Sequence, residues 1–495
     1  MKNFSSKHLF ILTASAVLLS STLSAQTFED FGDFGTDFGG ETKQGVTVSG
    51  RASLETRAYC DTDTSDKVEM QAIPDARLGF SFNGKQSDVN VVVHLDEYTI
   101  KNHPIDVLDE ATLRGYFGNF QIEAGIMKIV WGKGDKNHVI DNFNADDYHD
   151  FVIPDYIDRR VSTPMIRAKY NFPVNNLCLE GVYTPFLPVD RFAVNGKWVP
   201  GQVTQLKSLI TSNASNAVVT AAYKAKMDNS STAPLTTAAY LTALTQANNL
   251  NSNQDIIYPD MKTLKYGQYG GRLTGTFGPI DLGISYYNGY YKQPSVNAAK
   301  MSSYLTKYLS EASISEDEKF LAYDKKQTFG IEAAAAIWHF NIRGEACYNL
   351  TEDIEGTNPW IHNNSIAWLG GFDIDLPFWN MNLNIQETGT YILNRDKIRN
   401  NITDIEKSKN NNYAENKLIA NISTSFVNDK LVPEVTFIWV IENNDFVILP
   451  KITYSISDGL SLYASGMYIT STEEASQFYS WRNNSFVSLG ATYRF

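Results

Sequence analysis

The sequence predicts an all-β protein, a transmembrane antiparallel β-barrel of about 18 strands with one long, partly helical external loop. Two observations carry this prediction. Apolar and polar residues alternate with a period of two along most of the chain, and short turns alternate with long connecting segments. A mean hydropathy of −0.27 argues against a bundle of membrane-spanning helices.

The N-terminal residues have the pattern of an export signal. Lys2 and Lys7 precede the apolar run HLFILTASAVLLSSTLSA, whose last small residues suit cleavage before Gln26. The apolar core is too short and too early for a membrane span, so residues 1–25 are predicted to be a signal peptide. Residues 26–45, rich in Phe, Gly and acids, are expected to form a flexible periplasmic tail, with a lumen plug or a docking peptide as alternatives.

The turns give the strand count. Eight short turns join sixteen strands, and a first strand over 46–59 and a last strand over 486–495 bring the total to eighteen. With an even number of strands, the first and last residues of the barrel, residues 46–495, lie on the same side of the membrane. That side is predicted to be the periplasmic one, and the short turns lie there too. The short turns are expected near Asn83–Asp88, Gly118–Asn119, Phe172–Asn176, Gly278–Pro279, Trp338–His339, Leu376–Asn380, Val427–Lys430 and Ser457–Gly459.

Longer segments are expected to face outward. The longest, 188–266, contains runs rich in Ala, Thr, Asn and Ser that indicate short helices in one loop insertion. The outward segments include 60–73, 132–164, 188–266, 290–328, 349–363, 393–416 and 470–484.

Aromatic residues gather at the expected strand ends, as in the interfacial girdles of membrane barrels. A soluble β-sandwich would also alternate, but it needs neither girdles nor a strict alternation of short and long connections. The girdle residues are Tyr286, Tyr287, Tyr290, Tyr291, Trp338, Phe340, Trp368, Phe378 and Trp379.

The last strand ends in Tyr493 and Phe495, a pattern similar to the signal that barrel-assembly machinery reads in outer-membrane proteins. Together with an export signal, it predicts the outer membrane of a diderm, Gram-negative-type bacterium as the location. Outer-membrane lipid and the barrel-assembly machinery are then the expected partners.

Composition argues against several other classes of protein. A formal net charge of −13 makes the chain a poor candidate for nucleic-acid binding. Three widely separated cysteines do not suggest a disulfide framework. The sequence has no GxSxG, P-loop or CxxC motif, so neither an enzyme activity nor a cofactor is expected.

Two acidic stretches resemble metal sites without their ligand pattern. His138 and His149 flank several carboxylates, but no HExxH or other tight ligand spacing accompanies them. The run DTDTSD from Asp61 lacks the glycine and the glutamate at the sixth and twelfth places of a calcium loop. No metal site is therefore predicted.

Charged residues of both signs are expected on the face opposite the apolar one, lining a hydrated lumen. The bases concentrate on strands of the first half and several acids on later strands, so a transverse field would orient charged or dipolar solutes. Mutual pairing that stiffens the wall is an equally good interpretation. The predicted pore-lining residues are Arg51, Arg57, Arg77, Arg114, Arg167, Lys169, Arg272, Arg343, Glu55, Glu110, Glu123, Glu180, Glu332, Glu345, Asp373 and Asp375, with Asn382, Asn384, Gln386, Thr388 and Thr390 between them.

The segments GIMKIVWGKGD, DNFNADDY and IDRRVSTPMIRAKY follow one another as a strand end, an acidic stretch and a return into another strand. This pattern resembles a little-characterised family of large Gram-negative outer-membrane barrels related to the alginate-export porins, over about fifty residues. Alginate-export porins are eighteen-stranded and pass an anionic polysaccharide through an arginine-rich pore. Here luminal acids match bases in number, which puts anionic-polymer export in doubt.

The resemblance further implies that the loop after Trp131 folds around or into the mouth of the barrel, as a constriction or a structural latch. In that arrangement the acids of the loop face the basic stretch that follows it. The candidate constriction residues are Asp135, Asp141, Asp146 and Asp147, facing Arg159, Arg160 and Arg167.

The sequence therefore predicts a porin-like outer-membrane channel for passive or selective passage of small hydrophilic solutes. One alternative is a non-transporting surface protein or adhesin that works through 188–266. Another is a transporter of hydrophobic compounds plugged by the tail Phe28–Phe38. The solute, the gate and the oligomeric state are not determined by the sequence.

Overall fold

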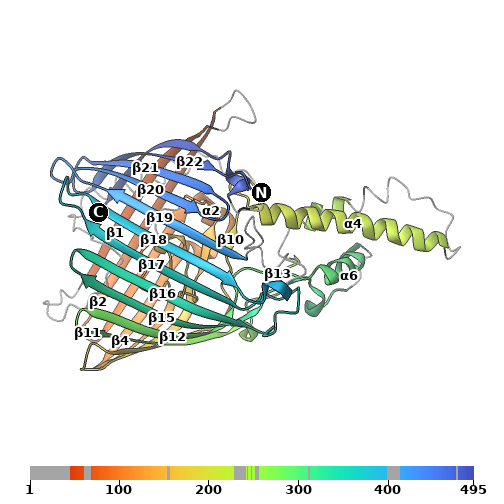
Figure 1. Cartoon of the computed structure of the whole chain (residues 1–495), viewed down its shortest axis with the longest axis horizontal. Helices are drawn as coiled ribbons and strands as arrows, with labels where there is room; N and C mark the ends of the chain where they lie inside the picture. The colour runs from red at the N-terminus through yellow and green to blue at the C-terminus, as the bar shows by residue number, and fades with distance from the viewer. Residues whose placement is uncertain are drawn as a thin grey trace.

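The chain folds into a closed barrel with helices standing at one end (Figure 1). The computed structural model describes residues 45–60, 68–152, 156–227 (218–227 as backbone), 241, 244–246, 248–250, 256–309, 313–397, 413–474, 476 and 478–495.

Eighteen strands form the barrel, and each pairs antiparallel with its neighbours along the chain. The predicted strand number is therefore confirmed. The strands are β1 (Val46–Tyr59), β2 (Glu69–Asn83), β3 (Ser87–Asp96), β4 (Leu108–Phe117), β5 (Phe120–Met127), β8 (Thr163–Asn171), β9 (Cys178–Thr184), β11 (Gln268–Phe277), β12 (Ile280–Tyr290), β15 (Lys325–Ile337), β16 (Phe340–Thr351), β17 (Ser365–Asp375), β18 (Asn382–Ile392), β19 (Ala414–Ser423), β20 (Leu431–Val440), β21 (Asp445–Ser455), β22 (Leu460–Thr470) and β23 (Phe486–Arg494).

The first and last strands close the sheet. β1 pairs with β2 on one side and with β23 on the other, in a register that places Tyr59 opposite Phe486 and Arg51 opposite Arg494. Closure pairs the backbone groups that an open sheet would leave at its edges.

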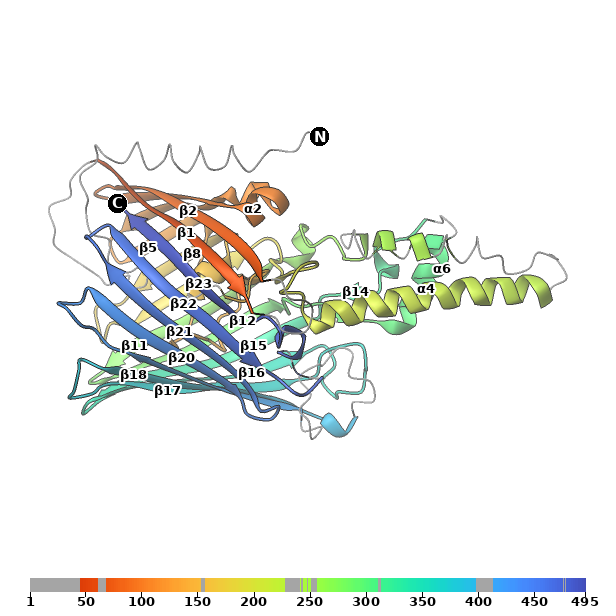
Figure 2. The ribbon, with the colours of Figure 1, turned by 90° about the horizontal axis from the view of Figure 1, so that it is seen from above.

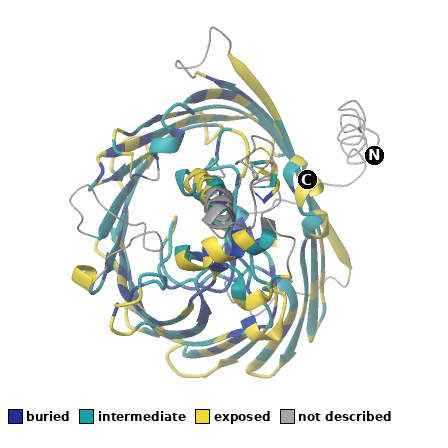
Figure 3. Ribbon diagram, turned by 90° about the vertical axis from the view of Figure 1, so that its right-hand side faces the viewer, coloured by how far each residue is buried: buried dark blue, intermediate teal, exposed yellow. Residues whose placement is uncertain are grey.

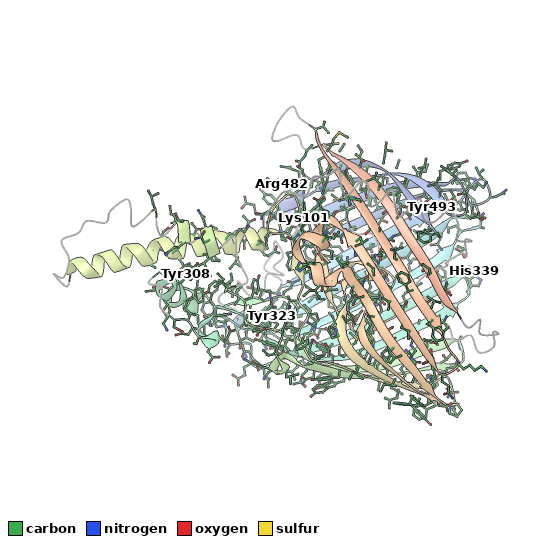
Figure 4. All side chains as sticks on the ribbon, turned by 180° about the vertical axis from the view of Figure 1, so that it is seen from behind. Lys101, Tyr308, Tyr323, His339, Arg482 and Tyr493 are labelled. Atoms are coloured by element: carbon green, nitrogen blue, oxygen red, sulfur yellow. The ribbon has the colours of Figure 1, made fainter. Side chains whose placement is uncertain are left out.

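The outer face of the barrel is apolar. Ile284, Ile331 and Leu489 are 59%, 60% and 69% exposed, as expected where alternate side chains point away from the lumen. Aromatic side chains stand at the short-turn end, where Trp338 is 83% exposed. In Figure 4, His339 and Tyr493 mark this end, and Lys101 and Arg482 mark the opposite one.

The predicted girdle is wrong for two tyrosines. Tyr287 is 1% exposed and lies inside the barrel, where its ring packs against Phe143 with centroids 5.2 Å apart. Tyr290 is also buried, in a small cluster with Tyr266 and Leu187. Alternation accounts for Tyr287, which takes the face opposite that of Tyr286. Tyr290 has the outward register and is buried because residues 187 and 266 pack on it.

All eight predicted short turns connect the expected strand pairs. Residues with positive φ tighten several of them, among them Trp338, at φ 58°, and Asn380, at φ 47°. At the opposite end, where long connections were expected, one connection is short. Residues 441–444 join β20 to β21 in a tight hairpin with Asn444 at φ 55°.

Helices stand beyond the long-connection end of the barrel. α4 (Gly201–Met227) projects away from the mouth, and α6 (Ala298–Leu309) packs beside it (Figures 1 and 2). Their apolar core includes Ile210, Met301 and Leu305. Among the described residues, no helix is long and apolar enough to cross a membrane.

The remaining elements are short. They are the helices α2 (Glu97–Asn102) and α3 (Tyr156–Arg159), the strands β6 (Ala145–Tyr148), β7 (Arg160–Val161), β10 (Arg191–Phe192), β13 (Ser295–Val296) and β14 (Leu321–Ala322), and the 3-10 turns η2 (Pro104–Val107), η4 (Leu264–Tyr266), η5 (Glu316–Glu318), η6 (Arg395–Lys397) and η7 (Tyr479–Trp481).

Parts of the chain other than the barrel strands lie inside the ring of strands in the view down the barrel (Figure 3). β6 pairs with β7 and β10, which joins residues 128–162 to residues 188–200 in a small internal sheet. We call these two segments, in their described parts, the inner plug.

Candidate functional site

The inner plug begins where β5 leaves the barrel wall. Trp131 is fully buried, and its Nε1 donates a 3.0 Å hydrogen bond to Glu180 of β9. Its ring meets Phe143, with centroids 5.0 Å apart. Asn144 fixes the first residues of the plug, because its Oδ1 accepts a hydrogen bond from the Ile129 backbone N–H at 2.9 Å. This packing fixes the direction in which the chain turns inward.

The carboxylate of Glu345, on β16, anchors the tip of the plug. It accepts backbone N–H bonds from Lys133 at 2.7 Å, Gly134 at 2.8 Å and Val139 at 2.9 Å, and it lies 2.9 Å from Nδ1 of His138. A buried carboxylate with this many donors is a strong local anchor, since hydrogen bonds to a charged acceptor are stronger than neutral ones.

A glycine allows this close approach. Gly132 has φ 122°, a conformation rare for other residues, and a Cβ there would collide with the Glu345 carboxylate. Both residues of the Trp-Gly dipeptide, which begins four residues beyond the end of β5, therefore have a structural role.

Ion pairs hold the opposite side of the plug to β1 and β2. Arg57 Nη1 lies 2.6 Å from Asp150 Oδ2. Arg51 Nη2 lies 3.2 Å from Asp158 Oδ2, and Arg77 contacts the same carboxylate. The plug is thus attached to the wall at both ends of its span.

The predicted facing of loop acids and bases is found only within the plug itself. Asp141 is 2.9 Å from Arg160 Nη2. Asp146 is 3.4 Å from Arg160 Nη1 and 3.7 Å from Arg159 Nε. Tyr156 also donates to Asp141, at 3.0 Å. These contacts hold this part of the loop together, and its role as a structural latch stays a prediction.

Three residues of the predicted constriction have partners other than those expected. Asp135 reaches across the lumen to Arg343 of β16, and Asp147 lies 3.8 Å from Arg191 of β10. Arg167 instead pairs with Glu180 at 2.7 Å, because both side chains share the inner face of adjacent strands β8 and β9. Loop conformation, which charge pattern alone does not set, decides these pairings.

Buried groups in the plug, and at residue 292 beside it, have shifted pKa values. Burial, with the nearby charge of Asp146, raises the pKa of Asp190 to about 6. Its Oδ1 accepts from the Asp146 backbone N–H at 3.0 Å. Burial also holds the pKa of Lys292 well below its usual range, with Lys326 adding to the effect.

The strand registers place the sixteen predicted pore-lining residues on the inner face, where most bases already have a carboxylate partner. Arg114 is 2.8 Å from Glu123, Arg57 is 2.7 Å from Glu55, and Arg272 contacts Glu332. The other described members have these partners or positions: Arg343 contacts Asp373, Asp375 accepts from Asn382 at 2.9 Å, and Glu110 and Lys169 have no ion pair in the described residues.

Whether these residues line an open pore stays a prediction. Their mutual pairing supports the wall-stiffening interpretation on this side of the lumen. Glu387 lies on the outer face, as strict alternation requires, and accepts a 3.0 Å hydrogen bond from Trp368 Nε1.

A cavity of about 160 Å³ lies between the plug and the opposite wall. Its lining is mostly polar and comes from the plug and the inner faces of β18 and β19: Asn137, His138, Val139, Thr388, Gly389, Thr390, Glu415 and Lys417. The Glu415 and Lys417 side chains pair with each other at 2.6 Å.

The tip of the plug touches β18 next to this cavity, toward the short-turn end. The Lys136 backbone N–H donates to Gln386 Oε1 at 3.2 Å, and Asn384 Nδ2 donates to Asp135 at 2.6 Å. Beyond this contact the inner face continues with Asn382, opposite Ser423 of β19. The tip is therefore the candidate constriction.

Another part of the wall is apolar inside as well as outside, contrary to expectation. Val440, Val447 and Ile469 of β20–β22 point inward and are covered by Trp198 of the plug and by Trp481. The runs FIWV and FVIL could have predicted this apolar inner face, since they are apolar on both faces of a strand. This cluster closes that side of the lumen.

The two histidines that suggested a metal site have other partners. His138 lies against Glu345, and His149 stacks on Tyr98 with ring centroids 3.6 Å apart and contacts Asp147 at 2.6 Å. In the described part of the chain, no group of three His, Cys, Asp or Glu side chains is arranged to hold a metal ion. Residues 1–44, with the predicted signal peptide and tail, and the run from Asp61 lie outside the described residues.

No protein-family model and no curated protein matches the chain. Among solved structures, it is similar to outer membrane protein opdK of Pseudomonas aeruginosa, with 10% identity and a TM-score of 0.42 over 91% of this chain and 99% of that one. OccAB3 of Acinetobacter baumannii gives 10% identity and a TM-score of 0.43, over 91% and 98% of the two chains. The outer membrane channel DcaP of the same organism gives 10% and 0.39, over 92% and 99%. The chain thus has a distant structural likeness to outer-membrane barrel proteins, and no family is identified for it.

Proposed function

We propose that the protein is an outer-membrane channel through which small hydrophilic solutes diffuse. The cavity between residues 137–139 of the plug and the inner faces of β18 and β19 carries this proposal. It is a polar space inside a barrel whose outer face is apolar, the arrangement that a membrane-spanning aqueous path requires. Export by the signal peptide and assembly through Tyr493 and Phe495 belong to the same proposal.

The attachment of the plug supports a narrowed rather than a sealed lumen. Glu345 holds the tip, and Arg51 and Arg57 hold the far side, so that the plug is fixed across the barrel. Facing β18, the described contacts of the tip are the two hydrogen bonds of residues 135 and 136. Solutes would pass between this tip and the wall.

Recording from single molecules of the purified, folded, full-length protein in a planar bilayer tests the proposal. Discrete conductance steps in potassium chloride are expected. Folded protein that inserts, as shown by protease protection of the barrel, and never conducts would overturn it.

The helical arm, formed by α4, α6 and the residues packed on them, favours a second candidate function, binding at the cell surface. α4 has 27 residues, a length of about 40 Å at 1.5 Å per residue, and projects from the mouth (Figure 2). A barrel with residues 201–257 and 297–320 replaced by short Gly/Ser linkers separates the two functions. Unchanged conductance with lost adhesion of cells to a surface would favour binding as the role of the arm.

A further inference from the structure

We infer that the cavity beside β18 and β19 recognises neutral, hydroxyl-rich solutes, of the class of small saccharides, in preference to ions of similar size. The inference rests on the proposed channel function and adds a substrate class to it. Its basis is the contrast between the charged groups that line the cavity, which pair within the protein, and the threonine hydroxyls of the cavity, which are available to a ligand.

The charged groups near the cavity have partners within the protein. Glu415 and Lys417 pair with each other at 2.6 Å, and Asp135 pairs with Arg343. The Glu345 carboxylate accepts three backbone N–H bonds and contacts His138. Within the cavity, a permeating ion would therefore meet no charge of opposite sign that lacks a partner, so nothing there would offset its lost hydration.

The hydroxyls of Thr388 and Thr390 line the cavity and make no hydrogen bond within the described part of the chain. Asn137 adds an amide on the plug side. A hydroxyl both donates and accepts, as does an amide, so these groups match the hydroxyls of a sugar. They suit a ligand that carries many hydrogen-bonding groups and no charge.

Uncharged groups also continue along the wall toward the short-turn end. Asn384 and Gln386 follow on the inner face of β18, and Asn421 lies opposite Asn384 on β19. Asn421 Nδ2 donates to Thr436 at 2.8 Å, so uncharged polar groups also continue onto the neighbouring strand β20. A neutral solute that leaves the cavity meets uncharged groups again at the plug tip, where Asn384 and Gln386 also bind residues 135 and 136.

Osmotic swelling of proteoliposomes that contain the full-length protein tests the inference. Glucose, the cation glucosamine and the anion gluconate are similar in size, and each is supplied at equal osmolarity. Glucose is expected to enter at least about three times faster than either charged analogue, as the gain of one hydrogen bond would produce. Equal or faster entry of a charged analogue overturns the inference.

The same preparation distinguishes this failure from failure of the channel function. Conductance in potassium chloride without preferential glucose entry rejects the substrate class alone. Absence of both conductance and swelling rejects the channel and the inference together.

The double variant Thr388→Val with Thr390→Val removes the two hydroxyls at nearly constant side-chain shape. Glucose entry should fall about two- to tenfold for each hydrogen bond lost, and by a larger factor than potassium chloride conductance. Thr492→Val, on the inner face of β23, is the matched control and should change neither rate. Unchanged glucose entry in the double variant overturns the inference, and so does an equal fall in glucose entry and potassium chloride conductance. If the variant does not fold, the ratio of glucose entry to entry of the charged analogues in the wild-type protein decides.

Discussion

The two sides of the lumen differ in what their polar side chains do. On β1–β16, the arginines of the inner face pair with carboxylates of the wall or the plug, as Arg272 does with Glu332 and Arg51 with Asp158. On β18 and β19, threonine side chains face the cavity, with the Glu415–Lys417 ion pair beside them. Charge on the first side holds the structure together, whereas uncharged polarity on the second leaves groups available to a solute.

The largest effect should come from breaking a buried pair of the first side. Arg272→Met leaves the buried carboxylate of Glu332 without its partner, next to Glu345 on the adjacent strand. The free energy of unfolding should fall by about 3–5 kcal/mol. Urea unfolding in detergent, followed by tryptophan fluorescence, measures it.

Lys417→Met on the second side is the control for that variant and should cost at most about 1 kcal/mol, because its pair is partly exposed. Equal losses in the two variants would remove the proposed difference between the walls.

Releasing the plug should have the next largest effect. Glu345→Ala removes the acceptor of three backbone N–H groups, and hydrogen bonds to a charged acceptor are stronger than neutral ones. The tip should leave the wall, and single-channel recordings should show a larger and noisier conductance. Glu110→Ala, an inner-face carboxylate without an ion pair in the described residues, should leave the conductance unchanged. A smaller conductance in Glu345→Ala would contradict the role of the anchor.

Filling the cavity tests the second side directly. Thr388→Trp places a large ring in a space of about 160 Å³, so conductance should fall severalfold without loss of stability. Thr492→Trp, on the inner face of β23, provides the control. Wild-type conductance in Thr388→Trp would mean that solutes take another route.

A moderate pH dependence is expected from Asp190. Since its pKa is raised to about 6, the protonated form stabilises the plug, and this contribution is lost as the pH rises through about 6. Transient openings should be more frequent at pH 8 than at pH 5 in planar-bilayer recordings. Asp190→Asn should abolish this difference, and a difference that persists in the variant would assign it to another group.

The smallest effect is expected from one charge beside the cavity. Lys417→Gln leaves Glu415 unpaired, which should raise the potassium-to-chloride permeability ratio by less than about twofold. Reversal potentials in a salt gradient measure the ratio. A shift toward chloride would show that Lys417 does not balance the charge of Glu415.

The strands and the short turns could be predicted because alternation and turn residues act locally. Both faces of each strand can be read from neighbouring residues, as on β23 from Val487 to Tyr493. The plug could not be predicted in detail, since Glu345 meets His138 across 207 positions of sequence. The expected partners of Asp135 and Arg167 were wrong for the same reason, because a charge pattern gives no long-range fold.

The pairing of β1 with β23 has a consequence for biogenesis. Gly50 and Phe495 exchange backbone hydrogen bonds of 2.9 and 3.0 Å, so the final seam joins opposite ends of the sheet. The cylinder can be sealed only after the ribosome has delivered the last hairpin, and contacts of such sequence separation form slowly. Until then both margins of the unfinished sheet expose open backbone groups that favour aggregation, so the unfinished barrel requires protection.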